Sequence, residues 1–114
     1  MNRDPQQFPD DDNGDTLWRM AEQGDDLSIS REVDFSVIFP TEESALKFAV
    51  HLLRNEQKVS FAQYEGSTSL PWQVQAHAMM LPTHKNISAF EALLERDSAP
   101  LGGRNDGWGC YSQP

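Results

Sequence analysis

Residues 31–53 read REVDFSVIFPTEESALKFAVHLL, and they join a strand to a helix. Apolar residues at the alternate positions 33, 35, 37 and 39 predict a strand over residues 31–39 with one apolar face. Pro40 ends this strand, and Thr41 is a residue type that caps helices. The apolar residues that follow recur with helical spacing and predict an amphipathic helix with one stripe: Ala45, Phe48, Ala49, Leu52 and Leu53.

The rest of the chain repeats this pattern. A second strand is predicted over residues 58–64 and a third over residues 72–80, where apolar and polar residues alternate. Thr83 or Asn86 is expected to cap a last helix, after which glycines turn the chain into a short fourth strand with Trp108, Cys110 and Tyr111. The order β-α-β-β-α-β predicts a ferredoxin-like α+β sandwich, with two helices on one face of a four-stranded antiparallel sheet. Four residues are expected to meet in its core: Phe35, Phe48, Val74 and Phe90.

The start of the chain has a different composition. Residues 1–14 include two prolines and the acidic run at residues 10–12, and we expect a disordered acidic segment whose removal leaves the melting temperature nearly unchanged. Asp15 or Thr16 is then expected to cap a short N-terminal helix that Gly24 ends. Residues 15–114 are predicted to form a single α+β domain.

Charge and composition narrow the choice of partner. The net charge is −9, and residues 1–26 hold eight of the 18 acidic residues but only two basic ones. Phosphate binding needs clustered lysine and arginine, which this chain lacks, so direct binding of nucleic acid is not expected. No apolar run has the length of a membrane span, and the start lacks the layout of a secretory signal. The single cysteine, Cys110, agrees with a reducing compartment, and we expect the protein in the cytoplasm.

The sheet face that the two helices leave open is the candidate binding surface. Tyrosine, histidine and methionine on such a face are residue types that fit a protein contact. RNA-recognition domains share the topology but carry aromatic and basic residues on their central strands, where this chain has glutamines and acids. The residues that we expect at a protein interface are Asp34, Ser36, Tyr64, Gln73, Gln75, His77 and Met79.

Catalytic, cofactor and metal sites find little support. An EF-hand loop aligned on Gly14 has Pro9 at its first ligand position and Met20 at its twelfth, where an acid is required. The three histidines lack zinc-ligand spacing, and no glycine-rich phosphate loop follows a strand. We therefore expect no metal, no cofactor and no catalytic residue. A nucleophilic pair of Cys110 with a histidine is the alternative within the enzyme class.

The end of the chain carries a rarer signature, the run Asp106-Gly107-Trp108-Gly109 followed by Tyr111. It resembles the closing signature of the regulator of ribonuclease E activity B (RraB) family. The resemblance covers most of residues 15–114 in the order of its elements. It implies a ferredoxin-like fold and a small acidic protein that inhibits an RNA-degrading enzyme, and it assigns a structural role to the signature residues.

Two functions remain open from these observations. The first is a non-enzymatic regulator that binds a protein partner, such as ribonuclease E or a related RNA-processing enzyme, through the open sheet face and acidic patches. The second is a small-ligand sensor, because related βαββαβ modules can dimerise and bind metabolites between subunits. An enclosed pocket with convergent polar groups would favour the sensor. The sequence leaves the oligomeric state undetermined.

Overall fold

A four-stranded antiparallel sheet is the scaffold of this α+β protein, whose computed structural model describes residues 2–113. The strand order is β2-β3-β1-β4, so that β1 and β3 lie in the centre and pair along their whole lengths. This arrangement confirms the predicted α+β class with an antiparallel sheet. The elements are α1 (Asp12–Glu22), β1 (Arg31–Phe39), α2 (Glu42–Arg54), β2 (Lys58–Gln63), β3 (Trp72–Met80), α3 (His84–Ser98), a 3-10 turn (Ala99–Leu101) and β4 (Arg104–Cys110).

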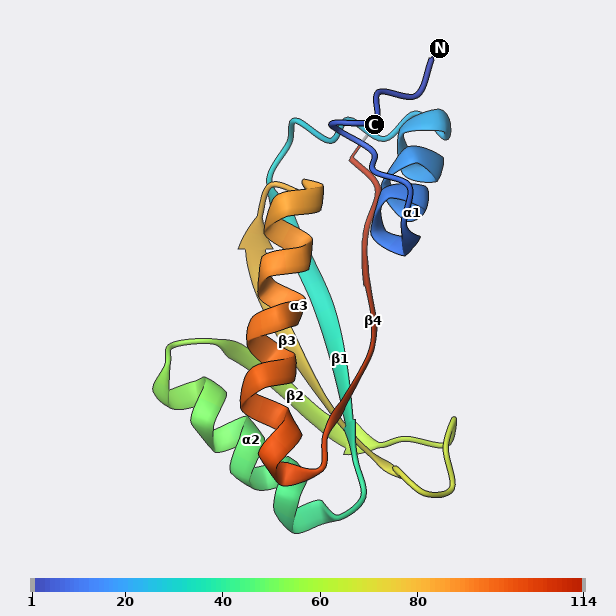
Figure 1. The fold of residues 1–114 in the computed structure, drawn as a ribbon. Helices are drawn as coiled ribbons and strands as arrows, with labels where there is room; N and C mark the ends of the chain where they lie inside the picture. The colour runs from blue at the N-terminus through green and yellow to red at the C-terminus, as the bar shows by residue number, and fades with distance from the viewer. Residues whose placement is uncertain (1, 114) are drawn as a thin grey trace.

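The core lies between the sheet and the helices α2 and α3, which cover one of its faces (Figure 1). The ring of Phe35 lies 4.6 Å from that of Phe90, and the ring of Phe39 lies 5.2 Å from that of Phe48, measured between centroids. Val74 completes the group from β3 and is fully buried. The predicted meeting of Phe35, Phe48, Val74 and Phe90 in one core is therefore confirmed.

One residue of the predicted helical stripe does not belong to this core. Ala45, Phe48, Ala49 and Leu52 are buried as expected, but Leu53 is 58% exposed. The sequence prediction for Leu53 is wrong because the sheet covers only a narrow side of α2. In the described residues no helix has both the length and the apolar character needed to cross a bilayer.

Threonine caps fix the starts of the two covering helices. Thr41 Oγ1 accepts a hydrogen bond from the Ser44 N–H at 3.1 Å, and Thr83 Oγ1 accepts one from the Asn86 N–H at 3.1 Å. Each bond satisfies a backbone donor that the first turn of a helix leaves unpaired. Of the two predicted caps for the last helix, Thr83 is correct.

The first helix starts earlier than predicted. The Asp11 carboxylate caps α1 by accepting from the Gly14 N–H at 2.8 Å, so α1 begins at Asp12 and not after Asp15 or Thr16. This hydrogen bond, followed by one from His84, holds the pKa of Asp11 below its ordinary value. Phe8 is buried and packs edge-on against Trp18 at 5.2 Å. The division of the chain into two parts at residue 14 stays a prediction. The contact of Phe8 with Trp18 joins residues on opposite sides of this boundary and gives the division no support.

A bulge in β4 explains the glycine-rich signature. Phe35 and Val37 of β1 are two residues apart, but their partners in β4, Trp108 and Asn105, are three apart. The extra residue shifts the alternation so that Asn105 and Trp108, three positions apart, lie on the same face, and Trp108 and Cys110 pack against the core. Gly107, with φ of +93°, takes the left-handed conformation that the bulge requires. The predicted short strand is thus longer, and Tyr111 lies just past its end, 84% exposed.

Replacing Gly107 with alanine is expected to lower the free energy of unfolding by about 1–2 kcal/mol, because a side chain is disfavoured at this φ. No heavy atom lies within 4 Å of a β-carbon added there, so the loss comes from the backbone alone. Gly109→Ala is the matched control, because that position also has free space and lacks a positive φ. Urea denaturation measures the free energy of unfolding of both variants. Equal losses would contradict the conclusion that the positive φ at position 107 requires glycine.

Candidate functional site

The open face of the sheet, on the side away from α2 and α3, gathers most of the residues predicted at an interface (Figure 1). Strand register places Asp34 opposite His77 and Ser36 opposite Gln75 across β1 and β3. Gln75 also lies opposite Ser60 of β2. Because side chains alternate along a strand, these residues share one face.

Hydrogen bonds link these side chains into a continuous chain across three strands. His77 Nδ1 lies 2.6 Å from Asp34 Oδ1, and His77 Nε2 lies 2.8 Å from Ser60 Oγ. Ser60 Oγ donates to Gln75 Oε1 at 3.5 Å, and Gln75 Nε2 donates to Ser36 Oγ at 3.1 Å. The linked side chains are held in place before any partner arrives, which reduces the ordering cost of binding.

Three residues of this surface are not among those predicted at the interface. Glu32 and Lys58 form an ion pair at 3.0 Å, beside the pair of Asp34 and His77. Ser60 is the residue that connects His77 to β2. Their positions in the strands could have revealed them, because each is an even number of residues from a residue already assigned to the open face.

Three of the predicted residues lie toward the ends of the open face. Tyr64 follows β2, and its N–H donates to Pro71 O at 2.6 Å, which closes the loop between β2 and β3. A hydrogen bond to the Asp106 carboxylate raises the pKa of Tyr64 above its ordinary value, so the phenol stays protonated. Gln73 pairs with the buried Ile38, whereas Met79 is 71% exposed. Ile38 has the strand parity of the open face, but it is buried.

Glu32, Asp34 and His77 could together offer ligand atoms to a divalent cation, since these atoms lie within 4.8 Å of one another. Each of them already has a partner: Lys58 pairs with Glu32, and His77 uses one ring nitrogen for Asp34 and the other for Ser60. The described contacts therefore satisfy this donor set without an ion.

Asp34, His77 and Ser60 also follow the order of an acid–base–nucleophile triad. A triad needs a pocket that holds the substrate against the nucleophile. The main cavities of the described residues lie elsewhere, on α2, around α1 and beside α3. The cavity on α2 and the one between α1 and β4 are open to solvent, so they add no support for the small-ligand sensor.

Cys110 is poorly placed to act as a nucleophile. Burial raises the pKa of its thiol above the ordinary value, although the nearby Arg31 acts in the opposite direction. The thiolate, which is the reactive form, is therefore scarce at neutral pH. The histidines pair with carboxylates instead of Cys110: His51 with Asp97, His77 with Asp34 and His84 with Asp11.

The signature at the end of the chain connects β4 to the helices. The Trp108 indole N–H donates to Asn13 Oδ1 at 2.9 Å. Asn13 Nδ2 in turn lies 2.7 Å from Glu91 Oε1 and 3.1 Å from Ser88 Oγ, both on α3. Together with the bulge at Gly107, these contacts describe a structural role for the signature.

Charge is unevenly distributed between the open face and the start of the chain. On the open face, the charge of Lys58 balances that of Glu32, which leaves little net charge. The first helix and the residues before it carry Asp10, Asp11, Asp12 and Asp15, of which Asp15 pairs with Arg3. The strongest acidic field therefore arises beside α1.

The chain matches the family described as RraB, regulator of ribonuclease activity B, over residues 10–110. None of the curated proteins matches it.

Proposed function

Because the chain belongs to the RraB family of ribonuclease regulators, we propose that it is a non-enzymatic protein that binds and inhibits a ribonuclease E-type enzyme. The observation that carries this proposal is the open face, a pre-ordered polar surface with an exposed methionine at one end. Such a surface suits contact with another protein better than it suits catalysis. We place the contact at Asp34, Ser36, Gln75, His77 and Met79, with Tyr64 and Gln73 at its edge.

Two different regions would contribute to binding. The open face provides contact area but little net charge, whereas the acidic residues near α1 provide long-range attraction. A negative field of this kind speeds association with a basic segment of the partner and disfavours contact with RNA. We therefore expect the regulator to compete for the enzyme and not for its substrate.

We also infer that the fold is ferredoxin-like. The support is the strand order β2-β3-β1-β4 together with two helices that each cross from one strand to the next but one in the sheet. A cytoplasmic location fits the unpaired cysteine.

Replacing Met79 with aspartate is expected to weaken binding to a purified ribonuclease E-type enzyme by about tenfold or more, because it places a charge in the contact. Met79 is 71% exposed, so folding should be unaffected. Leu93→Asp on α3, at 38% exposure, is the matched control on the opposite layer of the molecule. Biolayer interferometry gives the affinity, and cleavage of a fluorogenic RNA gives the inhibition.

The affinity of the unchanged protein should also fall as salt rises from about 0.1 to 0.5 M, because exposed charges are screened. Failure of the unchanged protein to bind or inhibit the enzyme at low salt would refute the partner. Equal losses for Met79→Asp and Leu93→Asp would refute the open face as the binding surface.

A further inference from the structure

Helix α2 has a second apolar stripe that residues 2–113 leave exposed. Leu46, Val50 and Leu53 are 44%, 45% and 58% exposed. Their spacing of four and then three residues places them along one line of the helix. This stripe is distinct from the stripe of α2 that packs against the sheet. Three large apolar side chains in a row on an exposed helix are typical of a contact surface.

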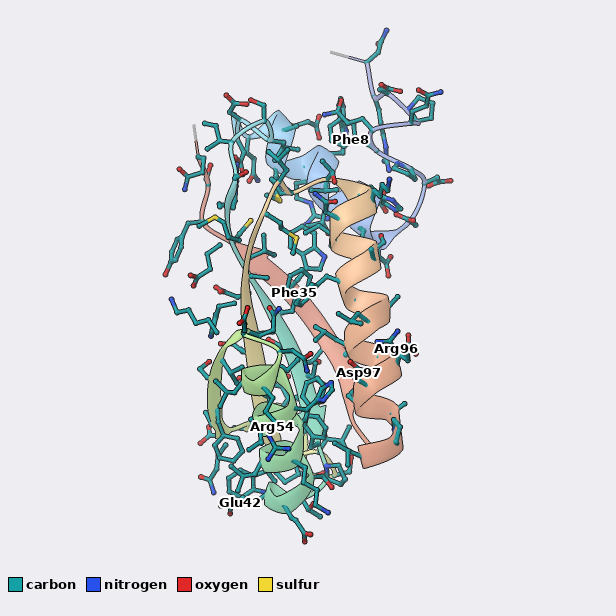
Figure 2. All side chains as sticks on the ribbon, turned by 90° about the vertical axis from the view of Figure 1, so that its left-hand side faces the viewer. Phe8, Phe35, Glu42, Arg54, Arg96 and Asp97 are labelled. Atoms are coloured by element: carbon teal, nitrogen blue, oxygen red, sulfur yellow. The ribbon has the colours of Figure 1, made fainter. Side chains whose placement is uncertain are left out.

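The charges beside this stripe change sign along the helix. Glu43 lies in the first turn and Arg54 in the last, and both line the same shallow depression as Leu46 and Val50. In Figure 2 α2 lies toward the viewer, with Glu42 and Arg54 labelled toward its opposite ends. A surface that is acidic at one end and basic at the other is complementary to itself when turned around.

We propose that this stripe binds a second copy of the chain, with the two α2 helices antiparallel across a two-fold axis. In that arrangement Leu46 faces Leu53 of the second copy, and Val50 lies near the axis. A helix rises 1.5 Å per residue, which brings Glu43 within about 3 Å, along the axis, of Arg54 of the second copy. Residues that flank the apolar stripe on the same side face each other across two antiparallel helices. The pair of Glu43 with Arg54 therefore forms twice, once from each copy. The interface is isologous, as in most homodimers.

Other occupants fit the stripe less well. A basic segment of a partner would be repelled by Lys47 and Arg54 over half of the helix. An acidic segment would be repelled by Glu43 at the other end. Only a partner with the reversed charge order satisfies both ends, and a second α2 has that order. Three half-exposed side chains bury less area than the roughly 800 Å² per partner of a standard interface, so the dimer is weak and depends on concentration.

This dimer does not rest on the proposed function. Helix α2 covers the face of the sheet opposite to the open face, so dimerisation leaves the open face accessible (Figure 1). A dimer would present two open faces, and with them two contact surfaces for a partner.

The first test is the mass of the protein in solution. Sedimentation velocity between about 10 and 300 µM, at 0.15 M NaCl, should show the mass rising from 12.9 kDa toward twice that value. At this salt concentration the repulsion between two chains of net charge −9 is screened over a distance of about 8 Å. Val50→Glu should remain monomeric, whereas Leu93→Glu on α3 should dimerise like the unchanged protein. Circular dichroism verifies that both variants fold. A monomer at every concentration, or a dimer unaffected by Val50→Glu, would overturn the proposal.

The second test is an exchange of charges. Glu43→Arg alone and Arg54→Glu alone should each weaken dimerisation about tenfold or more, because each places like charges opposite one another. The chain with both substitutions should dimerise again, and so should an equimolar mixture of the two single variants. Loss of pairing in the single variants without recovery in the mixture or the double variant would overturn the antiparallel arrangement. Ribonuclease binding by Val50→Glu, measured alongside, separates failure of the dimer from failure of the proposed function.

Discussion

Replacing Arg31 with glutamine is expected to lower the free energy of unfolding by about 3–5 kcal/mol, because it leaves a buried carboxylate without its cation. Arg31 Nη1 lies 2.7 Å from both carboxylate oxygens of Asp25, and each side chain is only 3% exposed. Arg31 Nη2 also donates to Asp26 O at 2.8 Å. In the variant, Asp25 Oδ1 still accepts a hydrogen bond from the N–H of Gln113 at 3.1 Å.

Chemical denaturation of three variants distinguishes the stabilising effect of this buried ion pair from that of an exposed ion pair. Arg31→Met combined with Asp25→Leu should lose less stability than Arg31→Gln, because no unpaired charge is buried. Lys47→Ala breaks an exposed ion pair, with Glu43, and should change stability by less than about 0.5 kcal/mol. If Arg31→Gln lost as little as Lys47→Ala, the buried pair would not stabilise the fold.

The periodicity of the sequence was sufficient to predict the sheet. Alternation alone placed β1 over Arg31–Phe39 and β3 over Trp72–Met80, as the structure has them. The same alternation puts Arg31 on the side of Val33 and Phe35, which was a signal for a buried charge. The partner could not be predicted, because Asp25 lies in a loop whose path depends on the finished fold.

The alternation of side chains along the strands also predicted part of the candidate surface. Strand parity brought Asp34, Ser36, Gln75 and His77 to one face. It could not predict that Asp106 raises the pKa of Tyr64, since these residues are far apart in the sequence.

For the start of the chain, composition could be compared only with contacts made over long range. Prolines and acidic residues predicted disorder over residues 1–14, but composition is a local property. Asn13 bonds to Trp108, 95 residues away, and Phe8 is buried against Trp18. Contacts of this range depend on which elements become neighbours after folding.

Replacing Trp108 with alanine is expected to lower the free energy of unfolding by about 2–4 kcal/mol. Complete burial of a tryptophan would place the loss at about 3–5 kcal/mol, but this ring is only partly buried where it packs against the core. Trp108→Phe keeps most of the packing and removes the indole N–H, so it should lose about 1 kcal/mol. Thermal and urea denaturation measure both, and equal losses in the two variants would contradict the role of packing.

The hydrogen bond from Trp108 to Asn13 also makes a prediction about the start of the chain. Asn13→Ala should destabilise the protein, and combining it with Trp108→Phe should add little, because both remove the same bond. Deleting residues 1–13 removes Asn13 and the buried Phe8 together, so the melting temperature should fall. This reverses the expectation from composition. An unchanged melting temperature after the deletion would contradict this prediction and support the expectation that the segment is disordered. Trp108 would then be held in place by its packing against the core alone.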